Sequence, residues 1–307
     1  MSRSPASLTA PRHWPLWLAL GLYRLFLRLP WRLRHATARG VATLYRRSNN
    51  RRVRIARTNL ALAFPEQSAA WREALLRDNL ATMACAVADY GLLWWRSEAA
   101  LERLLMVEGE THLRRCVEAG QPVILLTGHS VALDFGALAI SRRFAAVGLV
   151  KRMKNPLADR LVWRGRTRFR GHLHTRDEGL RPIIRAIKHG AAFYYLPDED
   201  LSHVRGSEWR FLPFFGLPTA TITALPRLAR VTGATILPCM TRLDPATGTY
   251  RVTIDPPLTD YPTDDEQAGS ERMNQELERM VRRDPRQYMW TLRLFKTRPN
   301  GEPSPYD

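Results

Sequence analysis

An alternation of short apolar runs with amphipathic segments, from about residue 110 onward, constrains the fold of this chain more than any other feature. The apolar runs are rich in Val, Ile and Leu, which is typical of buried strands. The predicted strands are 122–127, 145–150, 192–196, 235–241 and 250–254. The predicted helices are 110–118, 131–141, 157–170, 178–188, 221–231 and 266–283. This alternation predicts an α/β fold in which helices flank a mixed or parallel central sheet.

The segment before the sheet is predicted to be a basic connector over residues 34–57, followed by a helix. From residue 68 to residue 95, apolar side chains recur at spacings of three and four, which indicates an amphipathic helix. The three cysteines, Cys85, Cys116 and Cys239, are far apart and follow no metal-binding or redox spacing. We interpret them as reduced thiols of a protein that faces the cytoplasm, and we expect no metal and no cofactor.

The N-terminal residues are basic without any acidic counterpart. The chain carries a net charge of +18, and no Asp or Glu precedes Glu66. Thirteen arginines lie in that stretch: Arg3, Arg12, Arg24, Arg28, Arg32, Arg34, Arg39, Arg46, Arg47, Arg51, Arg52, Arg54 and Arg57. Such a segment suits a polyanionic surface, either anionic lipid headgroups or nucleic-acid phosphates.

The apolar content of the N-terminal residues favours lipid over nucleic acid. Residues 14–31 are rich in Leu and Trp, and tryptophans are typical of membrane interfaces. The longest uncharged run, residues 13–23, is shorter than the roughly 18 residues of a spanning helix. Arg24 and Arg28 lie four apart, so their side chains can reach the interface together. We therefore predict an anchor that dips into or marginally spans an anionic membrane over residues 1–33, one domain over 34–307, and no nucleic-acid partner.

The strongest candidate for catalysis is His129, in a segment that runs from an apolar strand through Gly128 into a predicted helix. Ligands gather at the carboxyl ends of such strands, where helix amides are free. Five residues on a regular helix rotate about 140° beyond a full turn, so His129 and Asp134 cannot share a helix face. If His129 lies in the turn before the helix, we expect Asp134 to accept a hydrogen bond from one ring nitrogen. The other nitrogen would then act as a base.

Two alternatives at this segment remain open. The spacing of a histidine and an acid five residues apart is weak evidence, because His172 with Asp177 and His203 with Glu208 repeat it in charged loops. Residues 128–132 also approach the Gly-x-Ser-x-Gly elbow of α/β-hydrolases, with Ser130 as nucleophile. Position 132 is alanine, however, and no histidine follows residue 203 where the triad histidine would be expected.

Basic and acidic residues downstream are candidates for binding substrate. Basic clusters at residues 151–154 and 164–170 suit a phosphate-bearing ligand. The acids that follow the strand at 192–196 are predicted to orient a base or an arginine, because no His or Cys lies at metal-ligand spacing. The predicted substrate-binding residues are Lys151, Arg152, Asn155, Arg164, Arg166, Asp198 and Asp200.

The order of several motifs resembles the late acyltransferases of lipid A biosynthesis, the lauroyl/myristoyl transferase family. The motifs cover nearly the whole chain. They are the Arg-rich run 51–59 before Phe64-Pro65, the His129-x4-Asp134 segment, Asn155-Pro156, residues 197–200, Phe211 to Gly216, Pro285 to Trp290 and Phe295 to Pro299. The motifs at 285–290 and 295–299 are the most specific. The family often has Glu where this chain has Asp134.

The resemblance implies a glycerolipid-acyltransferase-like fold and a particular reaction. A fatty acyl chain would move from an acyl-carrier-protein thioester to a hydroxyl of a Kdo-bearing lipid A precursor. The reaction would take place at the cytoplasmic face of the inner membrane. By the same resemblance His129 is the base, Asp134 is its partner, and the basic residues hold the phosphates of the glycolipid. Another lysolipid acceptor remains open.

Overall fold

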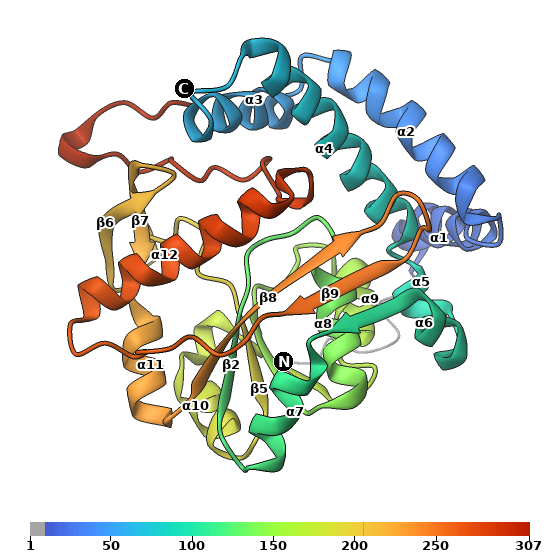
Figure 1. Cartoon of the computed structure of the whole chain (residues 1–307). Coiled ribbons are helices and arrows are strands. Elements are labelled where there is room, and N and C mark those ends of the chain that lie inside the picture. Colours follow the sequence, from blue (N-terminus) through green and yellow to red (C-terminus); the bar gives the residue numbers. More distant parts are fainter. Residues whose placement is uncertain (1–9, 205) are drawn as a thin grey trace.

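The computed structural model describes residues 10–204 and 206–307. Its centre is a seven-stranded sheet in the order β1-β9-β8-β2-β5-β3-β4 (Figure 1). The strands are β1 (Leu105–Glu108), β2 (Val123–Leu126), β3 (Ala146–Val150), β4 (Gly171–Thr175), β5 (Ala192–Tyr195), β8 (Thr235–Leu243) and β9 (Tyr250–Ile254). Five of them, from β8 to β4, are parallel, whereas β9 pairs antiparallel with β8 and parallel with β1. The predicted mixed α/β sheet and all five predicted strands are confirmed.

The strands that the sequence pattern did not predict lie at edges. β4 contains two histidines and one leucine, so it has no apolar run, and the predicted helix 157–170 ends earlier, at Arg166. β1 and β4 are the outer strands of the sheet. β6 (Trp209–Phe214) and β7 (Leu217–Ile222) form a separate antiparallel hairpin, and β6 contains a proline that a central strand would not tolerate.

Helices cover both faces of the sheet. The helices that follow the first strand are α7 (Glu110–Glu118), α8 (Leu133–Arg143), α9 (Pro156–Arg166), α10 (Arg181–Lys188), α11 (Ala224–Thr232) and α12 (Glu266–Arg283). All four residues of β2 are buried because successive side chains point to opposite faces. Ile124 and Leu126 belong to the core with α10, α11 and α12, and Val123 and Leu125 to the core with α7 and α8.

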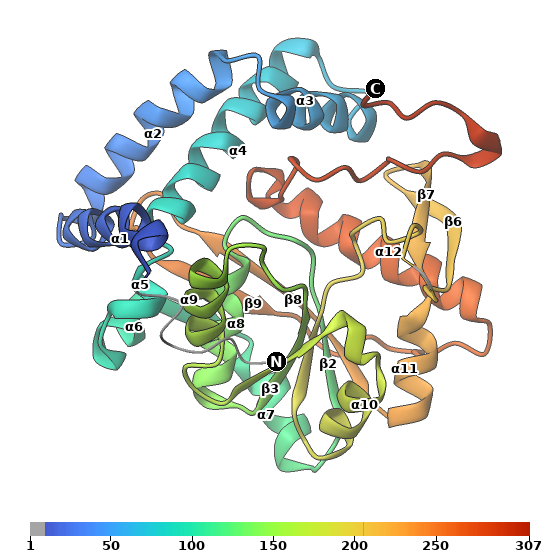
Figure 2. The ribbon, with the colours of Figure 1, turned by 180° about the vertical axis from the view of Figure 1, so that it is seen from behind.

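The N-terminal helices form a further layer beside the sheet (Figures 1 and 2). They are α1 (Trp14–Phe26), α2 (Trp31–Arg47), α3 (Arg51–Ala63), α4 (Ala69–Asp89), α5 (Leu92–Trp95) and α6 (Glu98–Leu104). The segment 34–57, interpreted from sequence as a basic connector, is therefore mostly helical. The predicted helix 68–95 is α4 followed by the short α5. Within residues 10–204 and 206–307, no helix combines the length and the hydrophobicity that crossing a bilayer requires.

A buried carboxylate holds this layer to the sheet. Asp89, at the end of α4, accepts hydrogen bonds from Arg34 Nε at 2.8 Å and from Tyr250 on β9 at 3.1 Å. Its second oxygen also lies 2.8 Å from His35 Nε2. All four residues are buried. A single carboxylate thus fastens α2 and α4 to the sheet, and Arg34 is structural although it was predicted from sequence as part of a basic, lipid-facing stretch.

Removal of this carboxylate should be costly. Asp89→Ala would leave the Arg34 guanidinium buried without its partner, so we expect the free energy of unfolding to fall by about 3–5 kcal/mol. Asp78→Ala is the matched control on the same helix, because Asp78 forms a solvent-exposed pair with Arg77. That control should change stability by less than about 0.5 kcal/mol. Urea titrations followed by circular dichroism measure both values, and equal losses would contradict the assignment.

Candidate active site

His129 lies in the turn between β2 and α8, as predicted, at the carboxyl end of the parallel strands. Gly128 precedes it in a crowded position. A Cβ atom at residue 128 would lie 3.2 Å from the ring of Tyr288 and 3.3 Å from Asp198 Oδ2. The absence of a side chain at Gly128 therefore allows Tyr288 and Asp198 to approach the turn that carries His129.

Asp198, in the loop after β5, binds His129 twice. The backbone N–H of His129 donates to Asp198 Oδ2 at 2.7 Å, and His129 Nδ1 lies 2.7 Å from Asp198 Oδ1. Because an ionised carboxylate only accepts hydrogen bonds, Nδ1 carries the proton and Nε2 is left as the basic nitrogen. The Tyr288 hydroxyl donates to Asp198 Oδ2 at 2.7 Å. Asp198 thus fixes both the tautomer and the orientation of the imidazole.

The electrostatics of this pair favour ionisation of both groups. Burial by itself would lower the pKa of His129, but the charge and hydrogen bond of Asp198 raise it above its ordinary value. Burial would raise the pKa of Asp198, but His129 and the hydrogen bonds from the His129 amide and Tyr288 lower it. His129 is therefore a stronger base than a free histidine, and Asp198 stays ionised beside it.

The predicted hydrogen bond between His129 and Asp134 is wrong. Asp134, in the first turn of α8, instead accepts hydrogen bonds from Arg166 Nε at 2.6 Å and Nη2 at 3.1 Å, and from the Tyr90 hydroxyl at 2.6 Å. Burial opposes ionisation of Asp134, but Arg166 and Tyr90 outweigh it and lower its pKa. The physical reason is competition, because a bidentate guanidinium is a stronger partner for a carboxylate than a neutral imidazole. Asp134 nevertheless lines the same cavity as His129.

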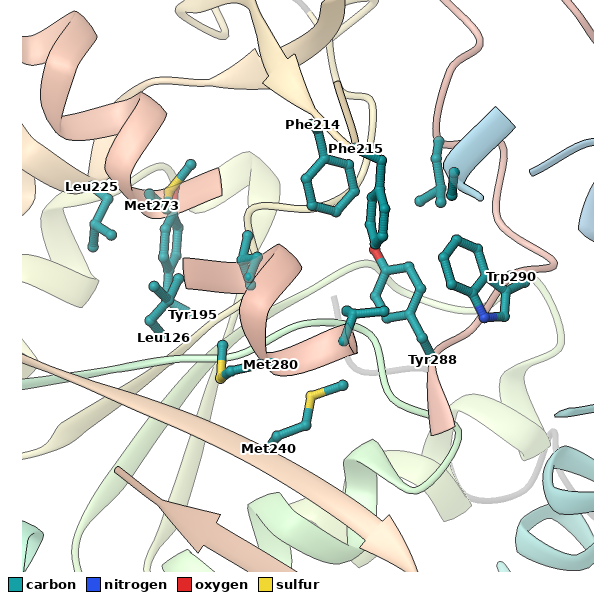
Figure 3. Packing of buried hydrophobic residues seen from close by; sticks show 14 of the residues in the cluster. Leu126, Tyr195, Phe214, Phe215, Leu225, Met240, Met273, Met280, Tyr288 and Trp290 are labelled. Atoms are coloured by element: carbon teal, nitrogen blue, oxygen red, sulfur yellow. The ribbon is translucent and has the colours of Figure 1, made fainter. Parts of the chain in front are cut away.

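The C-terminal motif closes around the turn of His129. Met289 N donates to His129 O at 2.8 Å, and Val131 N donates to Gln287 O at 2.7 Å. Tyr288 then packs edge-on against Trp290, with ring centroids 5.0 Å apart, and Trp290 against Phe215 at 5.6 Å (Figure 3). Residues of the motif at 285–290, one of the two most specific motifs, therefore contact the turn of His129 directly. Sequence reasoning missed Tyr288 and Tyr90 as partners of the acids, and only the motif at 285–290 pointed toward Tyr288.

The other predicted binding residues do not form one cluster. Arg166 and Lys151 line the cavity of His129. Arg152 pairs with Asp159 at 2.9 Å and stacks on Trp163, whereas the Asn155 side chain caps α9. Arg164 is exposed on α9. Asp200 accepts hydrogen bonds from Ser202 and from Thr297 N, which gives it a structural role. Of the predicted acids, Asp198 alone contacts the base.

Ser130 does not have the geometry of a nucleophile. Its side chain is 1% exposed, and its hydroxyl oxygen accepts a hydrogen bond from Ala132 N at 3.2 Å. Among the hydrogen bonds of the described residues, none links Ser130 to His129. The hydroxyl is therefore neither accessible to a substrate nor activated by the base, as an elbow serine must be.

A cavity of about 850 Å³ opens beside His129. Asp134, Arg166 and Lys151 are among the charged residues that line it, as are Arg181, Glu208 and Arg227, and most of the remaining wall is aliphatic or aromatic. A largely apolar cavity with a few polar groups suits a ligand with a long hydrocarbon part and a polar reacting group. A histidine with a free basic nitrogen beside such a cavity, and no described serine hydrogen-bonded to that histidine, suits an enzyme that activates a hydroxyl or water for direct attack.

Fold and site therefore describe an α/β protein in which a histidine, oriented by a carboxylate, lines a largely apolar cavity. The chain belongs to the bacterial lipid A biosynthesis acyltransferase family, whose model matches residues 1–297, and it is an acyltransferase. It is 33% identical over 302 residues to the lipid A biosynthesis lauroyltransferase of Escherichia coli K12, covering 98% of this chain and 97% of that protein. It is 33% identical to the palmitoleoyltransferase of the same organism over 298 residues (96% and 95%), and 32% identical to the myristoyltransferase over 303 residues (98% and 92%).

The pKa of His129 tests the role of Asp198. Asp198→Asn removes the charge that raises this pKa while burial remains, so the pKa of His129 should fall and its titration should move to lower pH. Because the base must be neutral, the acid limb of the pH–rate profile should move in the same direction, with a lower maximal rate. Histidine NMR measures the titration directly. Asp200→Asn, in the same loop, is the control, and an unchanged titration in Asp198→Asn would refute the assignment.

Proposed function

We propose that this enzyme transfers a fatty acyl chain from an acyl-carrier-protein thioester to a hydroxyl of a phosphorylated glycolipid, a Kdo-bearing lipid A precursor. The observation that carries the proposal is His129, which Asp198 orients and which lines a largely apolar cavity. The family and the names of the relatives support lipid A as the product. Another lysolipid acceptor is the second candidate, since the cavity selects hydrocarbon chains rather than a particular sugar.

The reaction requires only one base. His129 Nε2 removes the proton from the acceptor hydroxyl while the oxygen attacks the thioester carbonyl. The tetrahedral intermediate collapses, the carbon–sulfur bond breaks, and the leaving thiolate takes the proton from the imidazolium. Asp198 stabilises that imidazolium throughout, because its pKa keeps it ionised. No covalent intermediate on the protein is needed.

Arg166 is the candidate for stabilising the oxyanion. The amides of His129, Ser130, Val131 and Ala132, near the start of α8, already donate to other acceptors. Arg166 binds Asp134 through Nε and Nη2 and lines the cavity with His129. Asp134 and Tyr90 would then hold this guanidinium in place, so that Asp134 would support catalysis through Arg166.

The charge of the protein suits both proposed partners. With a net charge of +18, the surface attracts an acidic carrier protein by electrostatic steering. Lys151 and Arg164 form no ion pair with any described residue, so both remain available for phosphate oxygens.

Two substitutions test the catalytic assignment. His129→Ala should lower the acyl-transfer rate by roughly 10²–10⁴, the usual contribution of a positioned base. The acyl-transfer rate of Ser130→Ala should stay within about tenfold of the wild-type rate, because removal of a true nucleophile lowers the rate far more. Transfer of radiolabelled acyl groups to a lipid A precursor measures both, and mass spectrometry of lipid A from cells with and without the protein identifies the product. Near wild-type turnover by His129→Ala would refute the base, and a serine-reactive phosphonate that labels Ser130 would favour a hydrolase.

We further propose that α1 and α2 bind the cytoplasmic face of the inner membrane. Tyr23 fastens α1 to the body by donating to Val87 O at 2.9 Å and accepting from Gly91 N at 2.8 Å. The outer sides of the two helices expose aliphatic residues at helical spacing: Leu18, Leu22, Leu25, Leu33, Val41 and Leu44. Exposed arginines accompany them: Arg24, Arg28, Arg32, Arg39 and Arg47. Apolar residues flanked by arginines are typical of helices that lie in the plane of an anionic interface.

Vesicle flotation tests this surface. Leu22→Glu with Leu44→Glu removes one exposed leucine from each helix, so we expect the partition onto anionic vesicles to fall at least roughly tenfold. Val117→Glu, on α7, is the control for an exposed valine elsewhere. Wild-type binding should persist partly in high salt, since apolar burial is not screened. Deletion of residues 1–33 is less informative, because α2 begins at Trp31 and the deletion would cut into that helix. Unchanged flotation of the double variant would contradict the proposal. So would a wild-type protein that binds duplex DNA tightly but does not float with vesicles.

A further inference from the structure

The cavity beside His129 draws its walls from both faces of the sheet. One set of lining residues belongs to the core under α8: Leu133, Ala137, Ile140, Ala146 and Tyr194. A second set belongs to the opposite core, with α10 and α11: Leu149, Ile184, Phe193, Ala224 and Leu228. We call these two parts the α8 lobe and the α11 lobe.

The sheet separates the two lobes along most of their length. β3 is hydrogen-bonded to β5 on one side and to β4 on the other, in continuous register from its first residue, Ala146. No chain can pass through this ladder. His129, Leu196 and Pro197 also line the cavity, and they lie beyond the carboxyl ends of β2 and β5, where the ladder no longer separates the two faces. This is where we infer that the two lobes meet.

The lobes differ at their far ends. The α8 lobe ends at Ile140, Ser141 and Ala146, which are at most 7% exposed. From Ala146 to Val150 the strand spans about 13 Å, so this lobe is deep and blind. The α11 lobe ends at Val231 and Leu180, which are 48% and 37% exposed. It is therefore open to the surface, and its rim carries Arg181, which pairs with no described acid.

We propose that the α8 lobe holds the acyl chain of the donor and that the α11 lobe holds a hydrocarbon chain of the acceptor. This assignment rests on the proposed function. A blind lobe limits chain length, which matters for the single chain that is transferred. An open lobe with arginines at its rim suits a larger phosphorylated lipid with several chains. The thioester carbonyl and the acceptor hydroxyl would then approach each other from opposite faces of the sheet and meet at His129.

Two alanines, one on each helix, test the division. Ala137 on α8 and Ala224 on α11 are both half-buried and line only their own lobe. Ala137→Leu should shift the preference of the enzyme toward shorter acyl donors. The kcat/KM for a donor should fall by at least roughly tenfold for each methylene that no longer fits. The acceptor KM should not change. Ala224→Leu should raise the acceptor KM by about tenfold without altering the preferred donor length. Each variant is the matched control for the other, and Ala→Ser at both positions should change neither quantity.

A measurement on the wild-type enzyme keeps the proposal testable if a variant misfolds. An acyl donor with a diazirine near its methyl end should crosslink to peptides containing Ile140 and Ser141. Crosslinks to Ala224 or Leu228, or variants that both shift donor length, would overturn the division of the cavity. If the wild-type enzyme transfers no chain to any lysolipid hydroxyl, the proposed function fails instead. The crosslink still reports where the chain lies, so the two failures are distinguishable.

Discussion

The Asp198 carboxylate is the interaction on which the site depends. It receives hydrogen bonds from the backbone and ring of His129 and from Tyr288, so it joins the turn after β2, the loop after β5 and the C-terminal segment. A carboxylate buried without these donors would become protonated rather than stay charged. Gly128 leaves the space for this approach, and the aromatic cluster around Trp290 holds Tyr288 in place (Figure 3). The folded C-terminal motif is therefore part of what orients His129 and keeps Asp198 ionised beside it.

Two other carboxylates have different roles, one in the stability of the fold and one in the position of a side chain at the cavity. Asp89 fastens the N-terminal helices to the sheet, and Asp134 holds the Arg166 guanidinium at the cavity. In each case an arginine or histidine and a tyrosine complete the hydrogen bonding, which is what burial of a charge requires. The hydrogen-bonded sheet provides the other constraint, because its β3–β5 and β3–β4 ladders lie between the lining residues of its two faces.

The fold was largely predictable because the spacing of apolar residues along the sequence indicates which faces of helices and strands are buried. The predicted strands β2, β3 and β5 carry apolar or aromatic side chains over their whole length, since a parallel central strand is covered on both faces. β4 was missed because an edge strand needs no such run, and its two histidines gave no apolar pattern. The segment 34–57 was interpreted as a connector because its arginines obscured the helical spacing of Leu33, Val41 and Leu44.

The sequence by itself determined the α/β class, the position of His129 in a turn after a strand, and the family, because each depends on local pattern or on the order of motifs. Only the tertiary structure decided which acid partners the base. Asp134 is five residues from His129 and Asp198 is sixty-nine, yet Asp198 is the partner, because parallel strands bring their carboxyl ends to one edge of the sheet. Arg166, brought there by α9, takes Asp134 instead. The separation of two residues along the chain determines whether they are neighbours on a helix. Which charged side chains pair depends instead on which strand ends and helices the folded sheet brings together.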